Sequence, residues 1–245
     1  MTRFGAFLIH MAISLAIFAV LAVLVVFFWY PGFLFITDGG WQGLRLIGFV
    51  DLVLGPVLTL VIYKQGKPSL RKDMTAIATF QLICLSAGTF VVFSERPLAL
   101  VYVDGQFFSM SAGDYRSAGV AVPDLRHLPG PRPKRVAVEL PEDFAEQSEV
   151  RGTAYRSGVP LRALSERYVP LRFAALQVER EAVGYDTLLA QDAQAQQLPR
   201  WLEAHGGNLE DYAFFRFASR YVYSFLAVSR EQQEIVGFLS TPGRL

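Results

Sequence analysis

The sequence predicts a membrane protein with three transmembrane α-helices at residues 1–95, followed by an extracytoplasmic α+β domain with an antiparallel sheet at residues 96–245. The composition is apolar for a soluble protein: 52% of residues are hydrophobic, 18% are charged, and the mean hydropathy is +0.31. The apolar residues gather in three long runs before residue 94. Lysine and arginine are sparse there, at Arg3, Arg45, Lys64, Lys67, Arg71 and Lys72.

The first run, residues 7–30, is long enough for a spanning helix, which needs about 20 residues. It exceeds the apolar core of a signal peptide, and no small-residue cleavage site follows it. Trp29 and Tyr30 suit a membrane interface, and Pro31-Gly32 ends a helix. We therefore expect an uncleaved anchor.

The second and third spans are expected at residues 44–63 and 74–93. The third is weaker because Thr75, Thr79, Gln81 and Ser86 interrupt it. A buried helix of a soluble domain is the alternative for this segment. Its length favours a third crossing of the bilayer.

The short loops predict the orientation of the spans, because loops rich in lysine and arginine stay in the cytoplasm. Residues 64–73 hold four such side chains, whereas residues 31–43 hold none. Arg3 precedes the first span. The N-terminus and residues 64–73 are therefore expected inside, and everything after about residue 94 outside, which is the periplasm if the membrane is a bacterial inner membrane.

The sequence of the outer domain predicts several strands and helices. Residues 98–112 alternate around Asp104-Gly105, which is a strong hairpin signal. A loop rich in glycine and proline is expected at 113–133. Further strands are expected at 134–140, 212–219, 221–229 and 235–241, and helices at 141–155, 173–191 and 198–207.

A stripe of small and polar residues runs along the second span. Gly48, Asp51, Gly55 and Thr59 fall within roughly a quarter turn of one another on a helix. A bare carboxylate is costly in lipid, so Asp51 is expected to face protein. Pro56 removes a backbone donor and is expected to free the carbonyl near Leu52.

The neighbouring spans also carry polar groups on one face. The first span places His10 and Ser14 one turn apart, and the third places Gln81, Cys84 and Gly88 together. His10, Ser14, Thr59 and Gln81 are expected in the inner half of the bilayer, whereas Asp51 lies nearer the middle. These groups could simply hold a three-helix bundle together, or they could receive a helix from another protein.

Catalytic and cofactor signatures do not stand out. Asp51 is the deep aspartate, without the second one that an intramembrane aspartyl protease needs, and hydrolase, zincin and P-loop motifs do not occur. The single Cys84 cannot form an intrachain disulfide. A net charge of +1 argues against a nucleic-acid partner. We expect no enzyme, no catalytic residue, no cofactor and no metal site.

Several motifs occur together in one known family. They are WYPG (29–32), DLVLGPVLTL (51–60), GKPSLRKD (66–73), Gln81, Arg96-Pro97, LALVYVDGQFF (98–108) and REQQEIVGFL (230–239). In these the chain resembles the TfpX/TfpZ-type type IV pilin accessory proteins of bacteria. The resemblance is closest over the first 110 residues and loose over about 113–200.

The resemblance implies an inner-membrane, chaperone-like protein that binds a specific type IV major pilin and supports its stability or assembly into pili. We expect the face formed by Gly48, Asp51, Gly55 and Thr59, with Pro56, to dock the pilin helix. The resemblance also implies a pilin glutamate in the inner half of the bilayer, for which His10 or Gln81 lies at a better depth than Asp51. The outer domain is expected to read the pilin globular domain.

The main alternative is a membrane-tethered periplasmic ligand-binding or sensor protein. A sensor would need a signalling element inside, and residues 1–6 and 64–73 are short for one. A small enzyme on a membrane anchor is a second alternative, and it would need converging polar groups in the outer domain. The oligomeric state does not follow from the sequence.

Overall fold

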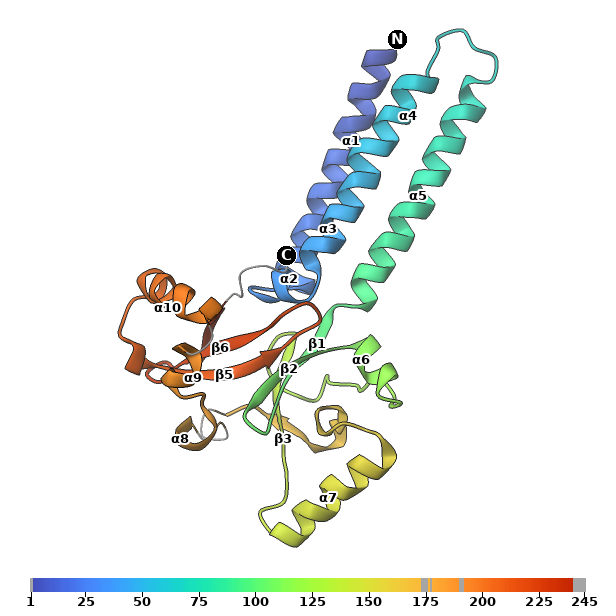
Figure 1. Ribbon diagram of the computed structural model, residues 1–245. Coiled ribbons are helices and arrows are strands. Elements are labelled where there is room, and N and C mark those ends of the chain that lie inside the picture. Colours follow the sequence, from blue (N-terminus) through green and yellow to red (C-terminus); the bar gives the residue numbers. More distant parts are fainter. Residues whose placement is uncertain (1, 173–175, 177, 190–191, 240–245) are drawn as a thin grey trace. The chain divides into compact units, whose positions relative to one another are not determined.

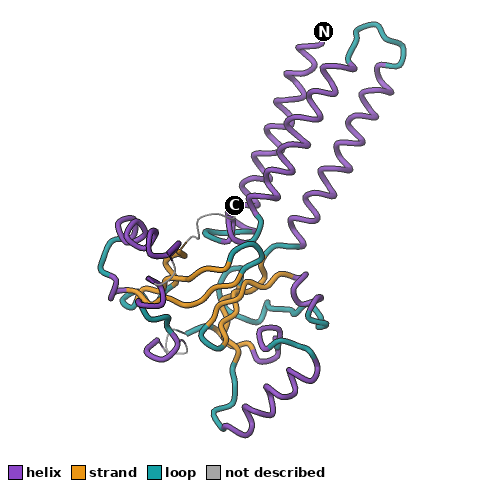
Figure 2. Tube along the Cα trace, in the orientation of Figure 1, coloured by secondary structure: helices purple, strands orange, loops and turns teal. Residues whose placement is uncertain are grey.

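The computed structural model describes residues 2–172, 176, 178–189 and 192–239. The chain divides into two compact units, Met1–Arg96 and Pro97–Leu245. Helices make up the first unit, and the strands lie in the second (Figure 1, Figure 2).

The first unit contains three long helices that run alongside one another (Figure 1). Among the described residues, Arg3–Trp29, Gly40–Ile62 and Leu70–Ser94 are long and apolar enough to cross a membrane. Each begins earlier along the chain than the predicted span, by about one turn. The first long helix comprises α1 (Arg3–Val23) and the π-helical turn Leu24–Trp29. The second comprises α3 (Gly40–Gly48), the π-helical turn η2 (Phe49–Leu54) and α4 (Gly55–Ile62), and the third is α5 (Leu70–Ser94). The short helix α2 (Leu34–Thr37) lies between the first two along the chain.

The outward-facing side chains of these helices are apolar, whereas their buried side chains include polar ones. The buried residues of α1 are Ala6 and Ser14, and those of α5 are Ile77, Gln81 and Val92. Large side chains such as those of Leu82, Ile83 and Phe90 are exposed instead. This arrangement suits helices surrounded by lipid, where small and polar residues mediate helix contacts.

An apolar cluster joins the end of the first long helix, the early part of the second and the end of α5. Val25, Tyr30, Ile47 and Val92 form it, and all four side chains are buried. The Tyr30 hydroxyl donates a hydrogen bond to the Val92 carbonyl at 2.8 Å. The end of the first helix is thereby fixed to α5.

The second unit is built on a seven-stranded sheet with the order β4-β3-β1-β2-β5-β6-β7. Four neighbouring pairs are antiparallel: β1 with β2, β3 with β4, β5 with β6, and β6 with β7. The strands are β1 (Pro97–Val103), β2 (Gln106–Ser111), β3 (Lys134–Val138), β4 (Tyr168–Pro170), β5 (Tyr212–Ala218), β6 (Tyr223–Ser229) and β7 (Ile235–Leu239).

The sheet is mixed, so the predicted antiparallel sheet is wrong in this respect. Strand β1 pairs with β3 in parallel, and β2 pairs with β5 in parallel. Parallel neighbours need a long connection between them. Both pairs have one, which is why the local hairpin signals of the sequence did not reveal them.

Helices and turns connect the strands. The predicted helix at 141–155 corresponds to α7, and the one at 198–207 to the end of α10. The described part of the predicted helix at 173–191 forms two short helices, one on either side of Gly184. Residues 173–175, 177 and 190–191 of that helix lie outside the described residues, as do residues 240–241 of the last predicted strand. The helices are α6 (Ala112–Ser117), α7 (Phe144–Ser157), α8 (Val178–Glu181), α9 (Tyr185–Leu189) and α10 (Asp192–His205).

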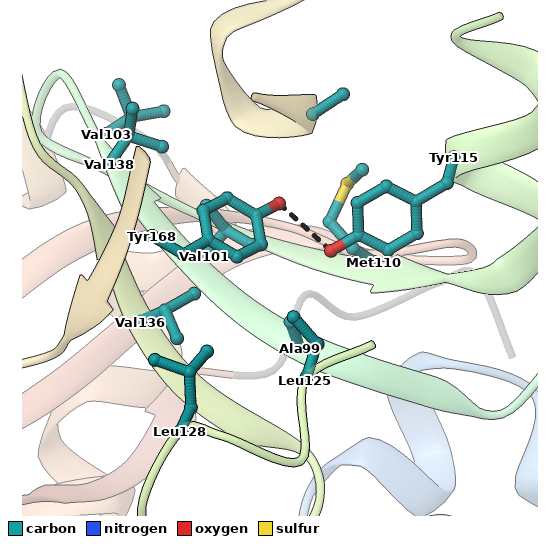
Figure 3. Packing of buried hydrophobic residues seen from close by; sticks show 11 residues of the cluster. Ala99, Val101, Val103, Met110, Tyr115, Leu125, Leu128, Val136, Val138 and Tyr168 are labelled. Atoms are coloured by element: carbon teal, nitrogen blue, oxygen red, sulfur yellow. Dashed lines mark hydrogen bonds between the residues drawn. The ribbon is translucent and has the colours of Figure 1, made fainter. Parts of the chain in front are cut away.

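Two apolar clusters fill the second unit. One packs β1, β2, β3 and β4 with α6, and Figure 3 shows Tyr115 of α6 and Tyr168 of β4 pointing toward each other within it. Their hydroxyl oxygens lie 2.9 Å apart. Burial raises the pKa of Tyr115 to about 12 and also raises that of Tyr168. The other cluster packs α9 and α10 on β5, β6 and β7.

Candidate functional site

Asp51 lies in a π-helical turn of the second long helix. In that turn the N–H of Gly55 bonds to the carbonyl of Val50, five residues earlier. The next residue in this pattern is Pro56, which has no N–H, so the carbonyl of Asp51 loses its helical donor. The side-chain amide of Gln81 replaces it, with Nε2 at 3.3 Å from the Asp51 carbonyl oxygen. The freed carbonyl is therefore one residue before the predicted one.

The Asp51 carboxylate is held inside the bundle. Ser14 donates its hydroxyl to Oδ1 at 3.1 Å, and Gln81 donates Nε2 to the same oxygen. The Asp51 residue is 1% exposed. Its Oδ2 atom has no hydrogen-bond partner among the described residues. The prediction that Asp51 faces protein is confirmed.

His10 extends this network toward the N-terminal end of α1. Its Nε2 lies 2.7 Å from Oε1 of Gln81, and its Nδ1 lies 2.6 Å from Oγ1 of Thr59. An amide oxygen can only accept, so Nε2 of His10 carries the proton in this contact. His10 thus reaches Asp51 through Gln81 rather than directly.

The glycines of the stripe permit close helix approach. A Cβ added at Gly55 would lie 2.2 Å from Oε1 of Gln81, and one added at Gly48 would lie 2.9 Å from a ring carbon of Phe18. Both distances are shorter than side-chain carbons tolerate, so α1 and α5 occupy the space that the small residues leave.

The structure brings most of the predicted site residues together. Five of them form one polar cluster together with Ser14. The five are His10, Asp51, Gly55, Thr59 and Gln81. Pro56 adjoins it and is buried, whereas Gly48 lies apart, against Phe18. Ser14 was absent from the predicted site, although its position one turn after His10 indicated the same face.

The cluster is internal to the three-helix bundle. Gln81 is 9% exposed and Thr59 is 2% exposed. A helix from another protein would reach these side chains only if α1 or α5 moved aside. The role of the stripe in binding a pilin helix stays a prediction. The contacts that the stripe makes in the structure are those that hold the three helices together.

A shallow apolar groove lies between α1 and α5 on the outside of the bundle. Its volume is about 620 Å³. Ile17 and Val20 line one side, and Ser86, Thr89 and Phe90 line the other. In the part of the chain that is described, no three His, Cys, Asp or Glu side chains are placed to hold a metal ion.

Comparisons with known proteins point to one group of relatives, in Dichelobacter nodosus. The chain is 31% identical over 109 residues to its "Fimbrial assembly protein, serogroups C1 and C2", which covers 43% of this chain and 82% of that relative. It is 30% identical over 126 residues to the serogroup I protein and 29% identical over 126 residues to the serogroup E1 protein. Each of these two matches covers 49% of this chain and 49% of the relative, so the match spans about half their length. No family model and no solved structure matches the sequence.

Proposed function

Because this chain belongs to the family of the Dichelobacter nodosus fimbrial assembly proteins, we propose that it supports type IV pilus assembly by binding one particular pilin. The observation that carries the proposal is the match covering 82% of the serogroups C1 and C2 protein. The proposed role is that of a TfpX/TfpZ-type accessory protein, chaperone-like and matched to its pilin. It requires no catalytic residue, cofactor or metal.

The proposed location is the bacterial inner membrane, with the N-terminus in the cytoplasm and the second unit in the periplasm. Three span-capable helices and the fimbrial relatives indicate a membrane protein. The four basic residues of the 64–73 connection support a cytoplasmic position for it, because positive loops are retained there. An odd number of spans then delivers the second unit to the other side.

The two units suit the two parts of the proposed partner. As the resemblance implies, a type IV pilin is anchored in the membrane by one apolar helix before assembly and carries a globular domain outside. The first unit offers helix surfaces in lipid, and the second offers a folded domain after the last span. We propose that the first unit contacts the pilin helix and the second contacts the pilin globular domain.

The proposal is tested by deleting the gene and measuring surface pili and pilin level. We expect fewer pili or less pilin, restored by the wild-type chain. Unchanged pili and pilin in the deletion strain would rule the proposed role out.

A photo-crosslinking side chain tests which surface of the first unit the pilin helix touches. Position 51 is buried in the bundle, position 86 lines the groove, and position 83 is exposed on α5. Crosslinks to pilin from position 51 would support docking on the stripe. Crosslinks from position 86 or 83 alone would show that the stripe serves the bundle and that the pilin helix binds elsewhere.

A further inference from the structure

The strand register shows which segments lie at the end of the sheet where the chain enters the second unit, at Pro97. Strand β1 starts there, and Pro97 lies opposite Ser111, the last residue of β2. Strand β3 runs parallel to β1, with Lys134 beside Ala99, so the residues just before β3 lie at the same end. This end of the sheet is here called the Pro97 end.

The β5–β6 turn lies at the Pro97 end as well. Strand β2 runs toward that end, and β5 runs parallel to β2, with Phe108 beside Ala218. Strand β5 then continues directly into a tight turn, in which the N–H of Ser219 donates to the carbonyl of Val222 at 2.9 Å. The turn at 219–222 and the start of β3 are therefore neighbours of Pro97 along the sheet edge.

A short link joins the Pro97 end to the last long helix. Helix α5 ends at Ser94, and the two residues Glu95 and Arg96 separate it from Pro97. Three residue steps reach at most about 11 Å. Helix α5 is long and apolar enough to cross a membrane. With α5 in a bilayer, the link keeps Pro97 close to the lipid headgroups.

Three exposed arginines lie at the Pro97 end. Arg132 and Arg135 flank the start of β3, and Arg172 follows β4. The two strands are joined there, because the N–H of Leu171 donates to the carbonyl of Arg135 at 3.0 Å. Within the part of the chain that is described, none of the three arginines forms an ion pair. A guanidinium matches the geometry of a phosphate group and binds it well.

The charges differ between the two ends of the sheet. At the Pro97 end, Glu95 belongs to the link, Asp114 is held in the capping box of α6, and Asp124 pairs with Arg126 at 2.7 Å. The opposite strand ends carry many acidic residues, among them Asp104, Glu139, Asp211, Glu231 and Glu234. The Pro97 end is therefore the one that suits an anionic partner.

Two exposed tyrosines occupy the β5–β6 turn. Tyr221 is 44% exposed and Tyr223 is 77% exposed. The guanidinium of Arg220 lies over the ring of Tyr221, 5.9 Å from its centre. Tyrosine is enriched where proteins meet lipid headgroups, because its ring is apolar and its hydroxyl is polar. This observation is independent of the three arginines and points to the same kind of surface.

The arginines and tyrosines form a broad row. They extend from β4 to β6, and the order of the sheet places five strand spacings between these two strands. At about 4.8 Å for each spacing, the row is about 24 Å wide. A row of this width suits a flat, extended surface better than a small ligand.

We propose that the Pro97 end of the sheet lies against the membrane and binds anionic phospholipid headgroups. Arg132, Arg135 and Arg172 donate to lipid phosphates, and Tyr221 and Tyr223 lie among the headgroups. Contact at this end directs the acidic end of the sheet away from the lipid, where like charges would repel it. The inference depends on α5 crossing a membrane and is independent of the proposed pilin binding.

The test uses the full-length chain in lipid nanodiscs with a nitroxide label near the Pro97 end. The label is attached to Pro131→Cys, an exposed position just before β3, in a Cys84→Ser background. It should be about threefold less accessible to a neutral nickel chelate in phosphatidylcholine discs with about 30% phosphatidylglycerol than in pure phosphatidylcholine discs. The difference should shrink as salt rises from about 0.05 M to about 0.5 M, because charges are screened.

A label at the opposite end of the sheet is the first control. Gln232→Cys places it in the exposed β6–β7 turn, where accessibility should be the same in both kinds of disc. Equal accessibility of the Pro131→Cys label in both kinds of disc would overturn the inference. A reduced accessibility that requires added pilin would overturn it too, because a protein would then cover this end.

Paired variants test the arginines. Arg132→Gln/Arg135→Gln should remove most of the difference between the two kinds of disc. The control Arg167→Gln/Arg216→Gln makes the same charge change away from the Pro97 end, since Arg167 precedes β4 and Arg216 lies beside Gln106 at the start of β2. It should keep the difference. Equal losses in both double variants would show that net charge alone matters and would overturn the inference.

A variant of the turn tests the tyrosines without altering the charge. Tyr221→Ser/Tyr223→Ser changes two exposed side chains and should also reduce the difference between the discs. A difference that survives both this variant and Arg132→Gln/Arg135→Gln contradicts the proposed contact. That result would leave the proposed pilin-binding function standing, because the capture of pilin is measured separately.

Discussion

Gln81 is the residue through which the three long helices meet. Its amide nitrogen donates to the carboxylate and the carbonyl of Asp51, and its amide oxygen faces His10 of α1. A polar group without a hydrogen-bond partner costs free energy in lipid. The Gln81 side chain provides hydrogen-bond partners for polar groups on two other helices. Gly55 is required because it leaves room for the amide.

Gly55→Ala should therefore lower the stability of the bundle. The added Cβ would lie 2.2 Å from Oε1 of Gln81, so the amide must shift and its hydrogen bonds weaken. We expect a loss of about 1–3 kcal/mol, the usual cost of leaving a buried polar group unsatisfied. Thermal unfolding of the full chain in detergent measures it.

The matched control is Gly88→Ala in α5. There the added Cβ would lie 3.7 Å from Ile47, an ordinary contact. It should leave stability unchanged or raise it, since alanine favours helix by up to about 1 kcal/mol over glycine. Equal losses at the two positions would mean that the Gln81 contact is unimportant.

The tyrosine pair in the second unit predicts a loss of stability at alkaline pH. The pKa of Tyr115 is about 12 in the folded chain and about 10 when exposed. Below pH 10 both states bind the proton, whereas between pH 10 and 12 the unfolded state releases it first. Stability should therefore fall through this window, and Tyr168 and Tyr102, whose pKa values burial also raises, should add to the fall.

Urea unfolding of the full chain, followed by circular dichroism of the sheet, measures this effect. Tyr115→Phe should make the decline between pH 10 and 12 shallower. Tyr223→Phe, at a position that is 77% exposed, should leave it as it is. A decline that Tyr115→Phe leaves unaltered would contradict the assignment to this pair.

At the level of elements, the sequence predicted what depends on near neighbours. The hairpin at Asp104-Gly105 forms as predicted, with positive φ at both residues, and the β5–β6–β7 meander follows its aromatic and β-branched pattern. Helix α6 (Ala112–Ser117) overlaps the start of the predicted loop at 113–133, where Ser111 and Asp114 form a capping box that signals a helix start.

What escaped prediction depends on residues far apart in the chain. The pairing of β2 with β5 joins residues about a hundred positions apart, and no local pattern encodes it. Likewise, the stripe of the second helix was predictable from spacing, but its neighbours were not. Whether it faces α1 and α5 or a partner protein depends on how the helices rotate about their axes, which hydropathy does not determine.

The second long helix is shaped jointly by Pro56 and Gln81. Pro56 removes the donor for the Asp51 carbonyl, and Gln81 supplies another. Gln81→Leu should destabilise the wild-type bundle by about 1–3 kcal/mol. In a Pro56→Ala background a backbone donor is restored, so the same change should cost less.

A double-mutant cycle measured by unfolding in detergent checks this coupling. Thr79→Leu, on the exposed side of α5, is the control for adding leucine to that helix and should be nearly neutral. If the cost of Gln81→Leu is the same with and without Pro56, the amide does not substitute for the missing donor.

At the level of the whole molecule, we propose that the two units bind two parts of one partner. The first unit is a bundle whose polar residues hold its own helices together. In the proposed role, its outer surfaces remain for lipid and for the pilin helix. The second unit carries a hollow beside α7, and the exposed Phe144 and Tyr155 lie on the opposite face of that helix. The sequence predicted a pilin partner through family resemblance, and the relatives in Dichelobacter nodosus are named fimbrial assembly proteins.

Capture of pilin by the full-length chain tests the central proposal most directly. The chain would be purified in detergent from cells that produce its own major pilin or, in parallel, an unrelated type IV pilin at the same level. We expect its own pilin to be retained and the unrelated one to be lost on washing. Equal retention of both pilins, or of neither, would contradict a specific pilin-binding role.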